Sequence, residues 1–192
     1  DTAYYMLVDS MSYDVEPPDD DGFYDIYISG LSGGQYGFNY TEGEGRSYVE
    51  IRNNYDEFVS YATNDELLQI TISHEYFHAI QRGYKPNFIA ADSYFLEMTS
   101  MWFEDVIVPT GNDYLGDSWV GTLLNNPSKS FNTGNGYDLA LFGHYLSSFI
   151  DSNGSLNAKN SIIMRQVWED YKSSSSYPRA FQSLKNVLNG VE

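Results

Sequence analysis

One segment dominates what this chain can fold into. Residues 64–84, NDELLQITISHEYFHAIQRGY, are apolar almost all the way round when placed on a helix. A helix of that kind lies at the centre of a domain. Asn64 suits the N-cap, Asp65 and Glu66 suit the positive end of the helix dipole, and Gly83 suits the C-terminal stop. We therefore predict a buried central helix from about residue 64 to residue 83, whose polar side chains need a reason to be there.

The part of the chain before this helix has the pattern of a small sheet. Strand candidates lie at residues 23–29 (FYDIYIS), 36–40 (YGFNY) and 47–53 (SYVEIRN), separated by the glycine-bearing turns GLSGGQ and TEGEG. Short turns favour antiparallel pairing, and the lobe as a whole is expected to contain a small mixed sheet. Residues 3–11 (AYYMLVDSM) predict a short helix that ends before the turn-rich run EPPDDDG.

The part after it reads as helical. Helices are expected at residues 92–109, 136–150, 160–171 and 178–188, the first capped by Asp92 or Ser93 and stopped by Pro109. The polar connector at 172–177 (KSSSSY) is too brief to mark a domain boundary. The prediction is an α+β fold in one domain, residues 1–192. Residues 1–83 form the lobe with the sheet and the central helix, residues 84–192 form a helical lobe, and a cleft lies between them.

Composition narrows the classes of partner. The chain has 27 acidic and 10 basic residues, a formal charge of −17, which repels phosphate backbones and anionic lipids and argues against nucleic-acid binding. No apolar run approaches the ~20 residues of a membrane helix, so no membrane insertion is expected. The chain has no cysteine, so packing must stabilise it without disulfides. The acidity and the lack of thiols suit an exported protein, and we expect an extracellular location. Nothing in the sequence indicates an oligomeric state.

The central helix carries two of the three histidines, His74 and His78. Four positions apart on a helix, they project from one face and can reach a single ion. This is the geometry of the HExxH motif, in which two histidines bind zinc and the intervening glutamate, here Glu75, acts as general base. The alternative is that the pattern is a coincidence of composition.

A catalytic zinc site needs a third protein ligand. Glu97 is the candidate, because it lies in the apolar run YFLEMTSMW, where an ionised carboxylate is costly without a cation or strong donors. The alternative is that Glu97 faces solvent or pairs with Arg82. Glu104 and Asp105 follow about two turns later on the same helix, and either could orient a ligand histidine or belong to a solvated helix end.

The motifs HEYFHAIQRGY, LEMTSMWFEDVIVP and NDYL, taken together, resemble the gluzincin group of zinc metallopeptidases. They look most like secreted bacterial members with the pattern HE(F/Y)FHAIQ and then EgxAxWxED. FYDIYI resembles an upstream strand of that group, and GYDLALFGHYL resembles a later helix, so the similarity runs from about residue 17 to 150. The resemblance implies a zincin-like fold, with zinc held by His74, His78 and Glu97 and with Glu75 as the catalytic base.

The chain departs from that group in two respects. EMTSM lacks the aspartate that thermolysin-like enzymes have four residues after the ligand glutamate, so the groups that orient the ligands are expected to be built differently. The chain also begins near where the group's sheet is already under way, and we expect an upstream strand and helix to belong to a segment outside this sequence.

Two further features concern the reaction and other ions. A zinc peptidase usually adds a donor that stabilises the oxyanion, and Tyr137 is the first choice because it follows the glycine-rich NTGNG, with His144 as its rival. Calcium is weakly indicated by the carboxylates of PPDDDG and GNDYLGD, because neither has EF-hand spacing and aspartate is common in turns for backbone reasons.

The function predicted from these residues is that of a zinc-dependent endopeptidase acting on peptides or unfolded proteins. The alternative is a non-catalytic metal-binding or interaction module, an inactive relative. An extended substrate would add as a strand to a sheet edge, with residues 36–40 or 47–53 as candidates. The aromatic residues of this region then predict a preference for bulky apolar side chains beside the cut.

Overall fold

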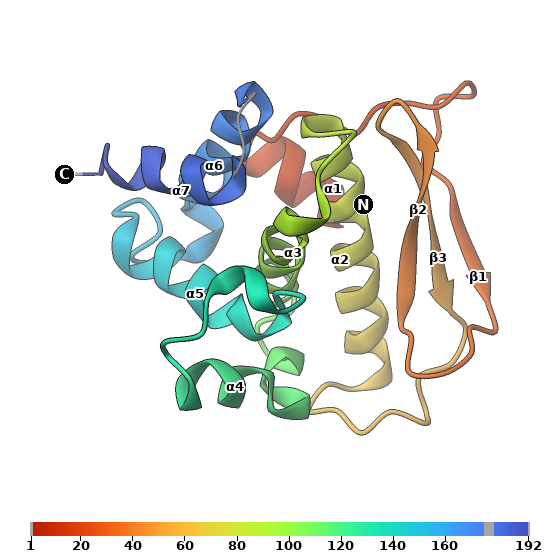
Figure 1. The fold of residues 1–192 in the computed structure, drawn as a ribbon. Helices are drawn as coiled ribbons and strands as arrows, with labels where there is room; N and C mark the ends of the chain where they lie inside the picture. The colour runs from red at the N-terminus through yellow and green to blue at the C-terminus, as the bar shows by residue number, and fades with distance from the viewer. Residues whose placement is uncertain (1, 175–178, 192) are drawn as a thin grey trace.

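The computed structural model describes residues 2–174 and 179–191 and has an α+β architecture (Figure 1). The strands are β1 (Ile26–Ser29), β2 (Gly37–Gly43) and β3 (Arg46–Arg52). The helices are α1 (Thr2–Tyr4), α2 (Asn64–Tyr84), α3 (Ser93–Ile107), α4 (Trp119–Asn125), α5 (Ala140–Tyr145), α6 (Ile163–Ser173) and α7 (Arg179–Leu188). Two of them continue as π-helical turns, α1 over Tyr5–Ser10 and α5 over Leu146–Ile150. The sheet lies on one side, α2 and α3 lie in the middle, and α5 to α7 lie on the far side.

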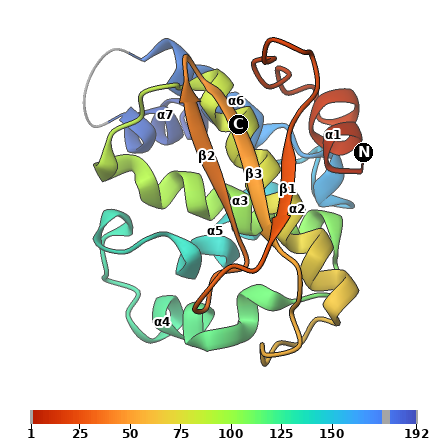
Figure 2. The same ribbon diagram turned by 90° about the vertical axis from the view of Figure 1, so that its right-hand side faces the viewer.

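The sheet is mixed, with the strand order β1-β3-β2 (Figure 2). β2 and β3 pair antiparallel, as their short turn predicts, with Phe38 opposite Glu50. β1 pairs parallel with β3, so the expectation of antiparallel pairing is wrong for this strand. The reason is that loop 30–36 leads from β1 to a strand, β2, that is not its neighbour in the sheet. The β2–β3 hairpin then returns the chain, and β3 lies between β1 and β2. Residues 47–53 therefore lie in the central strand and offer no free edge, whereas β2 is an edge strand.

Helix α2 is the predicted central helix, with a different cap. Thr63, not Asn64, is the N-cap: its hydroxyl accepts a hydrogen bond from the Glu66 backbone N–H, and the Glu66 side chain accepts one from the Thr63 N–H. Gly83 does not end the helix, which continues to Tyr84. A Cβ at Gly83 would lie 3.1 Å from Cδ of Pro17, so close packing of the N-terminal segment explains this glycine.

The core lies between α2, α3 and the C-terminal helices. Val49 and Ile51 of β3 are buried against α2, which thus has the sheet on one side and α3 on the other. The largest fully buried side chains are mostly aromatic and include Phe77, Phe95, Trp102, Phe103, Trp168 and Tyr171. Rings of this size bury much apolar area, which suits a chain without disulfides. Helices α2 and α3 therefore lie at the centre of the core.

The remaining predicted helices are confirmed with small shifts. The helix expected at 92–109 is α3, that at 136–150 is a turn (Tyr137–Leu139) leading into α5, and those at 160–171 and 178–188 are α6 and α7. Helix α4 was not predicted. Residues 175–177 of the connector and Pro178 lie outside the described residues. Within the described part of the chain, no helix is long and apolar enough to cross a membrane.

Candidate metal centre

The two histidines of α2 and the glutamate of α3 come together in the middle of the molecule. Nε2 of His74 lies 3.1 Å from Oε2 of Glu97, and Nε2 of His78 lies 3.4 Å from the same oxygen. One ligand atom from each of the three residues fits within a span of 4.8 Å. The group forms because α2 and α3 are antiparallel neighbours and each presents these residues on the face toward the other.

The other ring nitrogen of each histidine is held by a polar side chain. Nδ1 of His74 lies 2.5 Å from Oε1 of Glu104, and Nδ1 of His78 lies 2.8 Å from Oε1 of Gln81. An acceptor at Nδ1 fixes the proton there and leaves the Nε2 lone pair for a metal. Of the two acidic candidates, the structure thus places Glu104 against His74 and Asp105 elsewhere.

Gln81 is a functional candidate that the sequence reasoning missed. It is buried, and its amide N–H groups lie 3.1 Å from the Leu96 carbonyl oxygen and 3.1 Å from the hydroxyls of Thr99 and Ser100 on α3. The amide therefore links the two helices and orients His78 at once. The available signal was a glutamine three residues after the second histidine, on the same face of an otherwise apolar helix.

The electrostatics of the group favour a cation. Burial alone would lower the pKa of His74, but hydrogen bonds to Glu104 and Glu97 hold it well above its usual value. Burial would raise the pKa of Glu97, yet the charge of His78 and the hydrogen bond with His74 hold it well below its usual range. An imidazole that lies between two carboxylates can donate a hydrogen bond to both of them only when it is protonated and carries a positive charge. With a divalent ion held by Nε2 and Glu97, a neutral His74 would satisfy Glu104, so this donor set fits zinc.

We call His74, His78 and Glu97 the metal group. Glu75 lies beside it, where β2 packs on α2. Its side chain lines two adjoining cavities, of about 420 Å³ and about 240 Å³, and both are also lined by His74 and Gly37. A Cβ on Gly37 would lie 2.7 Å from Cγ2 of Thr71 and 3.1 Å from Cγ of Glu75. The glycine therefore allows the edge strand to approach α2 at the position of Glu75.

Tyr137 also reaches this site. Its ring lies 6.1 Å from that of His74, and it lines both cavities. The preceding Gly136 has φ of 103°, and a Cβ there would overlap the Tyr94 carbonyl oxygen, so only glycine brings this loop so close to α3. Burial raises the pKa of Tyr137 well above its usual value, and the carboxylate of Glu97 raises it further.

His144 is placed differently. Its Nε2 lies 3.4 Å from Oδ2 of Asp105, and its ring lies 5.3 Å from that of Tyr114. Burial lowers the pKa of His144 and raises that of Asp105 to about 6. Neither residue lines the two cavities that hold the metal group.

The other sequence alternatives also have definite positions. Arg82 does not pair with Glu97; its Nε donates to Oδ1 of Asn39 over 2.5 Å. In the first calcium candidate, Oδ1 of Asp19 accepts hydrogen bonds from the backbone of Asp21 and Gly22, the ordinary role of aspartate in a turn. In the second candidate, Asp113 accepts a hydrogen bond from the Ser60 hydroxyl over 2.5 Å.

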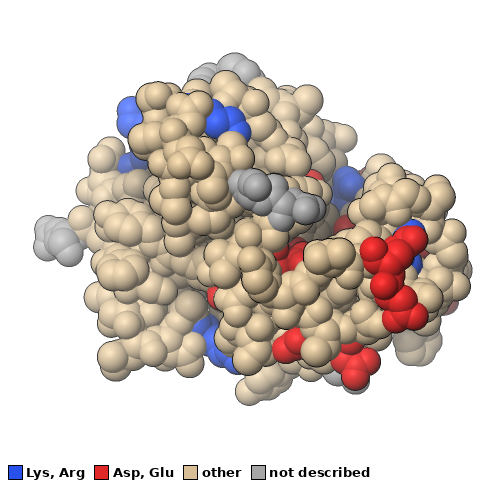
Figure 3. Space-filling view, turned by 90° about the horizontal axis from the view of Figure 1, so that it is seen from below, with Lys and Arg blue, Asp and Glu red and all other residues tan. Residues whose placement is uncertain are grey.

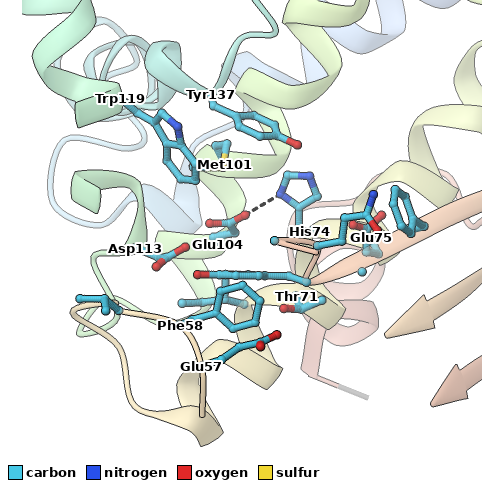
Figure 4. A pocket seen from close by; sticks show the side chains of 17 residues that line it. Glu57, Phe58, Thr71, His74, Glu75, Met101, Glu104, Asp113, Trp119 and Tyr137 are labelled. Carbon is cyan, nitrogen blue, oxygen red and sulfur yellow. Dashed lines mark hydrogen bonds and ion pairs between the residues drawn. The ribbon is translucent and has the colours of Figure 1, made fainter. Parts of the chain in front are cut away.

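The larger cavity contains residues that the sequence reasoning did not connect with the site (Figure 4). Glu57 and Phe58 come from the loop before α2, and Asp113 and Trp119 come from the segment around the start of α4. Only tertiary structure brings these loops beside His74.

Comparisons of the chain with known protein families, with curated proteins and with solved structures find no match. A proposal for the function must therefore rest on the geometry of the site.

Proposed function

We propose that this chain is a zinc-dependent endopeptidase that hydrolyses peptide bonds in peptides or unfolded proteins. One observation carries the proposal: two imidazole Nε2 atoms and a carboxylate oxygen of Glu97 converge, while Glu104 and Gln81 hold the opposite nitrogens of the same rings. A chance HExxH sequence has no reason to be accompanied by a third ligand and two orienting groups.

Three protein ligands are the number typical of a catalytic zinc site, whereas structural sites are closed by four Cys or His ligands. Zinc bound here would supply a Lewis acid that polarises the scissile carbonyl and makes water a better nucleophile.

The residues of the chain have the remaining roles. Glu75 faces the same cavities as His74 and takes the proton of the attacking water, then delivers it to the leaving amine. Tyr137 lies across from it, with its hydroxyl directed toward His74 in Figure 4, and donates a hydrogen bond to the carbonyl oxygen as that atom gains charge.

The edge strand β2 suits an extended substrate. It borders both cavities through Gly37 and Phe38, and it lies at the edge of the sheet. A peptide that adds to this edge gains main-chain hydrogen bonds, which do not depend on its sequence. A folded protein has few extended segments free for such pairing, so we expect unfolded chains to be cleaved in preference to compact ones.

The experiment combines metal analysis with cleavage of a labelled, unfolded protein. We expect the wild type to bind zinc and to cleave the substrate. Glu75→Gln should keep the zinc and the fold and lose activity by at least about 100-fold, because the amide preserves shape and removes the base. Zinc binding without any cleavage by the wild type would instead identify a non-catalytic metal-binding module.

A further inference from the structure

The larger cavity is the natural place for a substrate side chain, an inference that rests on the proposed function. Its volume is about 420 Å³, within the range of ligand pockets. It adjoins the smaller cavity that contains His78 and Glu97, and the two share His74, Glu75 and Tyr137 in their walls. A peptide held at the metal group would therefore have this cavity directly beside its scissile bond.

The charged residues in the wall of this cavity are almost all acidic. Glu57, Glu75, Glu104 and Asp113 line it, and His74 is the basic side chain among its lining residues. Arg52 lies close, 4.9 Å from the centre of the Phe58 ring, but its guanidinium donates to the carbonyls of Leu31 and Gly33 and pairs with Glu57. The Arg52 guanidinium is thus already paired with these groups and is not among the lining residues of the cavity. A cation in the cavity would be attracted, and an anion repelled.

Asp113 is the acidic group best placed to select a ligand. Its side chain is buried at the far end of the cavity from Glu75, and it points in Figure 4 toward the same space as Glu104. The Ser60 hydroxyl donates to Oδ1 of Asp113, which fixes the carboxylate. Glu104 is in contact with His74, next to the scissile bond, and Glu57 is largely exposed, whereas Asp113 is buried.

Aromatic rings form the walls between Asp113 and the metal group. Trp119 and Phe58 border the same space, and the Trp119 ring packs against Tyr137 with centroids 5.2 Å apart. Such walls suit the apolar stem of a long side chain, and their faces attract a cation. Aromatic walls that lead to a buried carboxylate match lysine or arginine.

We infer that this cavity selects a basic side chain, lysine or arginine, beside the scissile bond, and that Asp113 determines the selection. Seen from below in Figure 3, acidic side chains gather mainly on the right-hand side of the molecule, and basic side chains are scattered over the same face. The sequence alone predicted a preference for bulky apolar side chains, because Glu57 and Asp113 could not be assigned to the same cavity as the aromatic rings.

The test measures binding and cleavage of two end-blocked peptides that differ in one side chain, Ala-Ala-Lys-Ala-Ala and Ala-Ala-norleucine-Ala-Ala. Binding is measured on the Glu75→Gln protein, which suppresses turnover. We expect the lysine peptide to bind about tenfold more tightly, the effect of one hydrogen bond to a charged group. Asp113→Asn, which keeps an acceptor for Ser60, should remove most of this difference and leave the norleucine peptide unaffected.

The matched control is Glu42→Gln, which removes the same charge from an exposed position on β2 outside this cavity. It should keep the tenfold preference, and thermal unfolding should show both variants folded. Equal affinity of the Glu75→Gln protein for the two peptides, or tighter binding of the norleucine peptide, would overturn the inference. Because binding is scored without turnover, a protein that prefers lysine but cleaves neither peptide would contradict the proposed hydrolysis and leave the selection intact.

Discussion

Nδ1 of His74 lies 2.5 Å from Oε1 of Glu104, a residue two helical turns beyond Glu97 on α3. One face of α3 thus provides both Glu97, which could bind a metal together with His74 and His78, and the carboxylate that orients His74 on the neighbouring helix. The residue four positions after Glu97 is Met101, and the carboxylate that contacts His74 lies on the next turn of α3.

The first prediction concerns this contact. Glu104→Gln keeps the shape of the side chain but weakens the hold on the Nδ1 proton of His74, so zinc affinity should fall by about 10- to 100-fold. Competition with a chelator of known affinity measures the change. Asp105→Asn is the matched control, because Asp105 contacts His144 and not a ligand. Equal zinc affinity of Glu104→Gln and Asp105→Asn would show that Glu104 does not orient the ligand.

The second prediction concerns Gln81. Gln81→Met has a similar length but removes the hydrogen bonds to α3 and to His78. The polar groups of α3 would lose a buried partner, and the free energy of unfolding should fall by about 1 to 3 kcal/mol, measured on the metal-free protein with urea. Zinc affinity should fall as well. A variant that loses stability but keeps full zinc affinity would assign Gln81 to packing alone.

The third prediction concerns Gly136. Gly136→Ala places a methyl group against the Tyr94 carbonyl at a φ of 103°, so the loop must move and carry Tyr137 with it. Peptide cleavage should decrease by about tenfold or more while zinc remains bound, because Tyr137 and not a ligand is displaced. Gly30→Ala is the control, since a Cβ there meets nothing within 4 Å. Full activity of Gly136→Ala would argue against a role for Tyr137.

The fourth prediction concerns pH. Burial raises the pKa of Asp105 to about 6, so ionisation of this group opposes folding increasingly as the pH rises from its unfolded pKa through about 6. Asp105→Asn removes this effect. The variant should be more stable than the wild type by about 1 to 2 kcal/mol at about pH 8, and the two should be equally stable near pH 4.

Urea unfolding at both pH values checks this. The lowered pKa of His144 acts in the opposite direction, reducing stability as the pH falls below its unfolded pKa, but it is present in both proteins. A variant less stable than the wild type at the higher pH would mean that Asp105 and His144 form a stabilising ion pair.

Much of the fold could be predicted because its main elements carry local signals. The apolar run of α2, the run of α3 before Pro109 and the glycine turns around β2 each specify an element from neighbouring residues. The parallel pairing of β1 with β3 has no local signal, because it depends on how loop 30–36 passes the end of the sheet. Helix α4 is only seven residues long, contains Gly121 and buries none of its side chains, so its local signal is weak.

In the site, too, some features follow from local sequence signals and others depend on tertiary contacts. His74, His78 and Glu97 were predicted as a group from helical spacing and from the cost of a buried carboxylate, and the structure brings them together. The choice between Glu104 and Asp105 depends on the rotation of α3 against α2, which a sequence does not fix. The larger cavity forms where the loop of Ser60 meets the loop of Asp113. These loops are about 50 residues apart in the sequence, and only tertiary contacts bring them together.

Zinc content of the purified protein tests the central claim most directly. Elemental analysis after dialysis should give about one zinc per chain for the wild type and for Glu75→Gln, and a large loss for His78→Ala and for Glu97→Ala, each of which removes one of three ligands. A folded wild-type protein that takes up no zinc, or that holds it equally well without His78 and Glu97, would contradict the account.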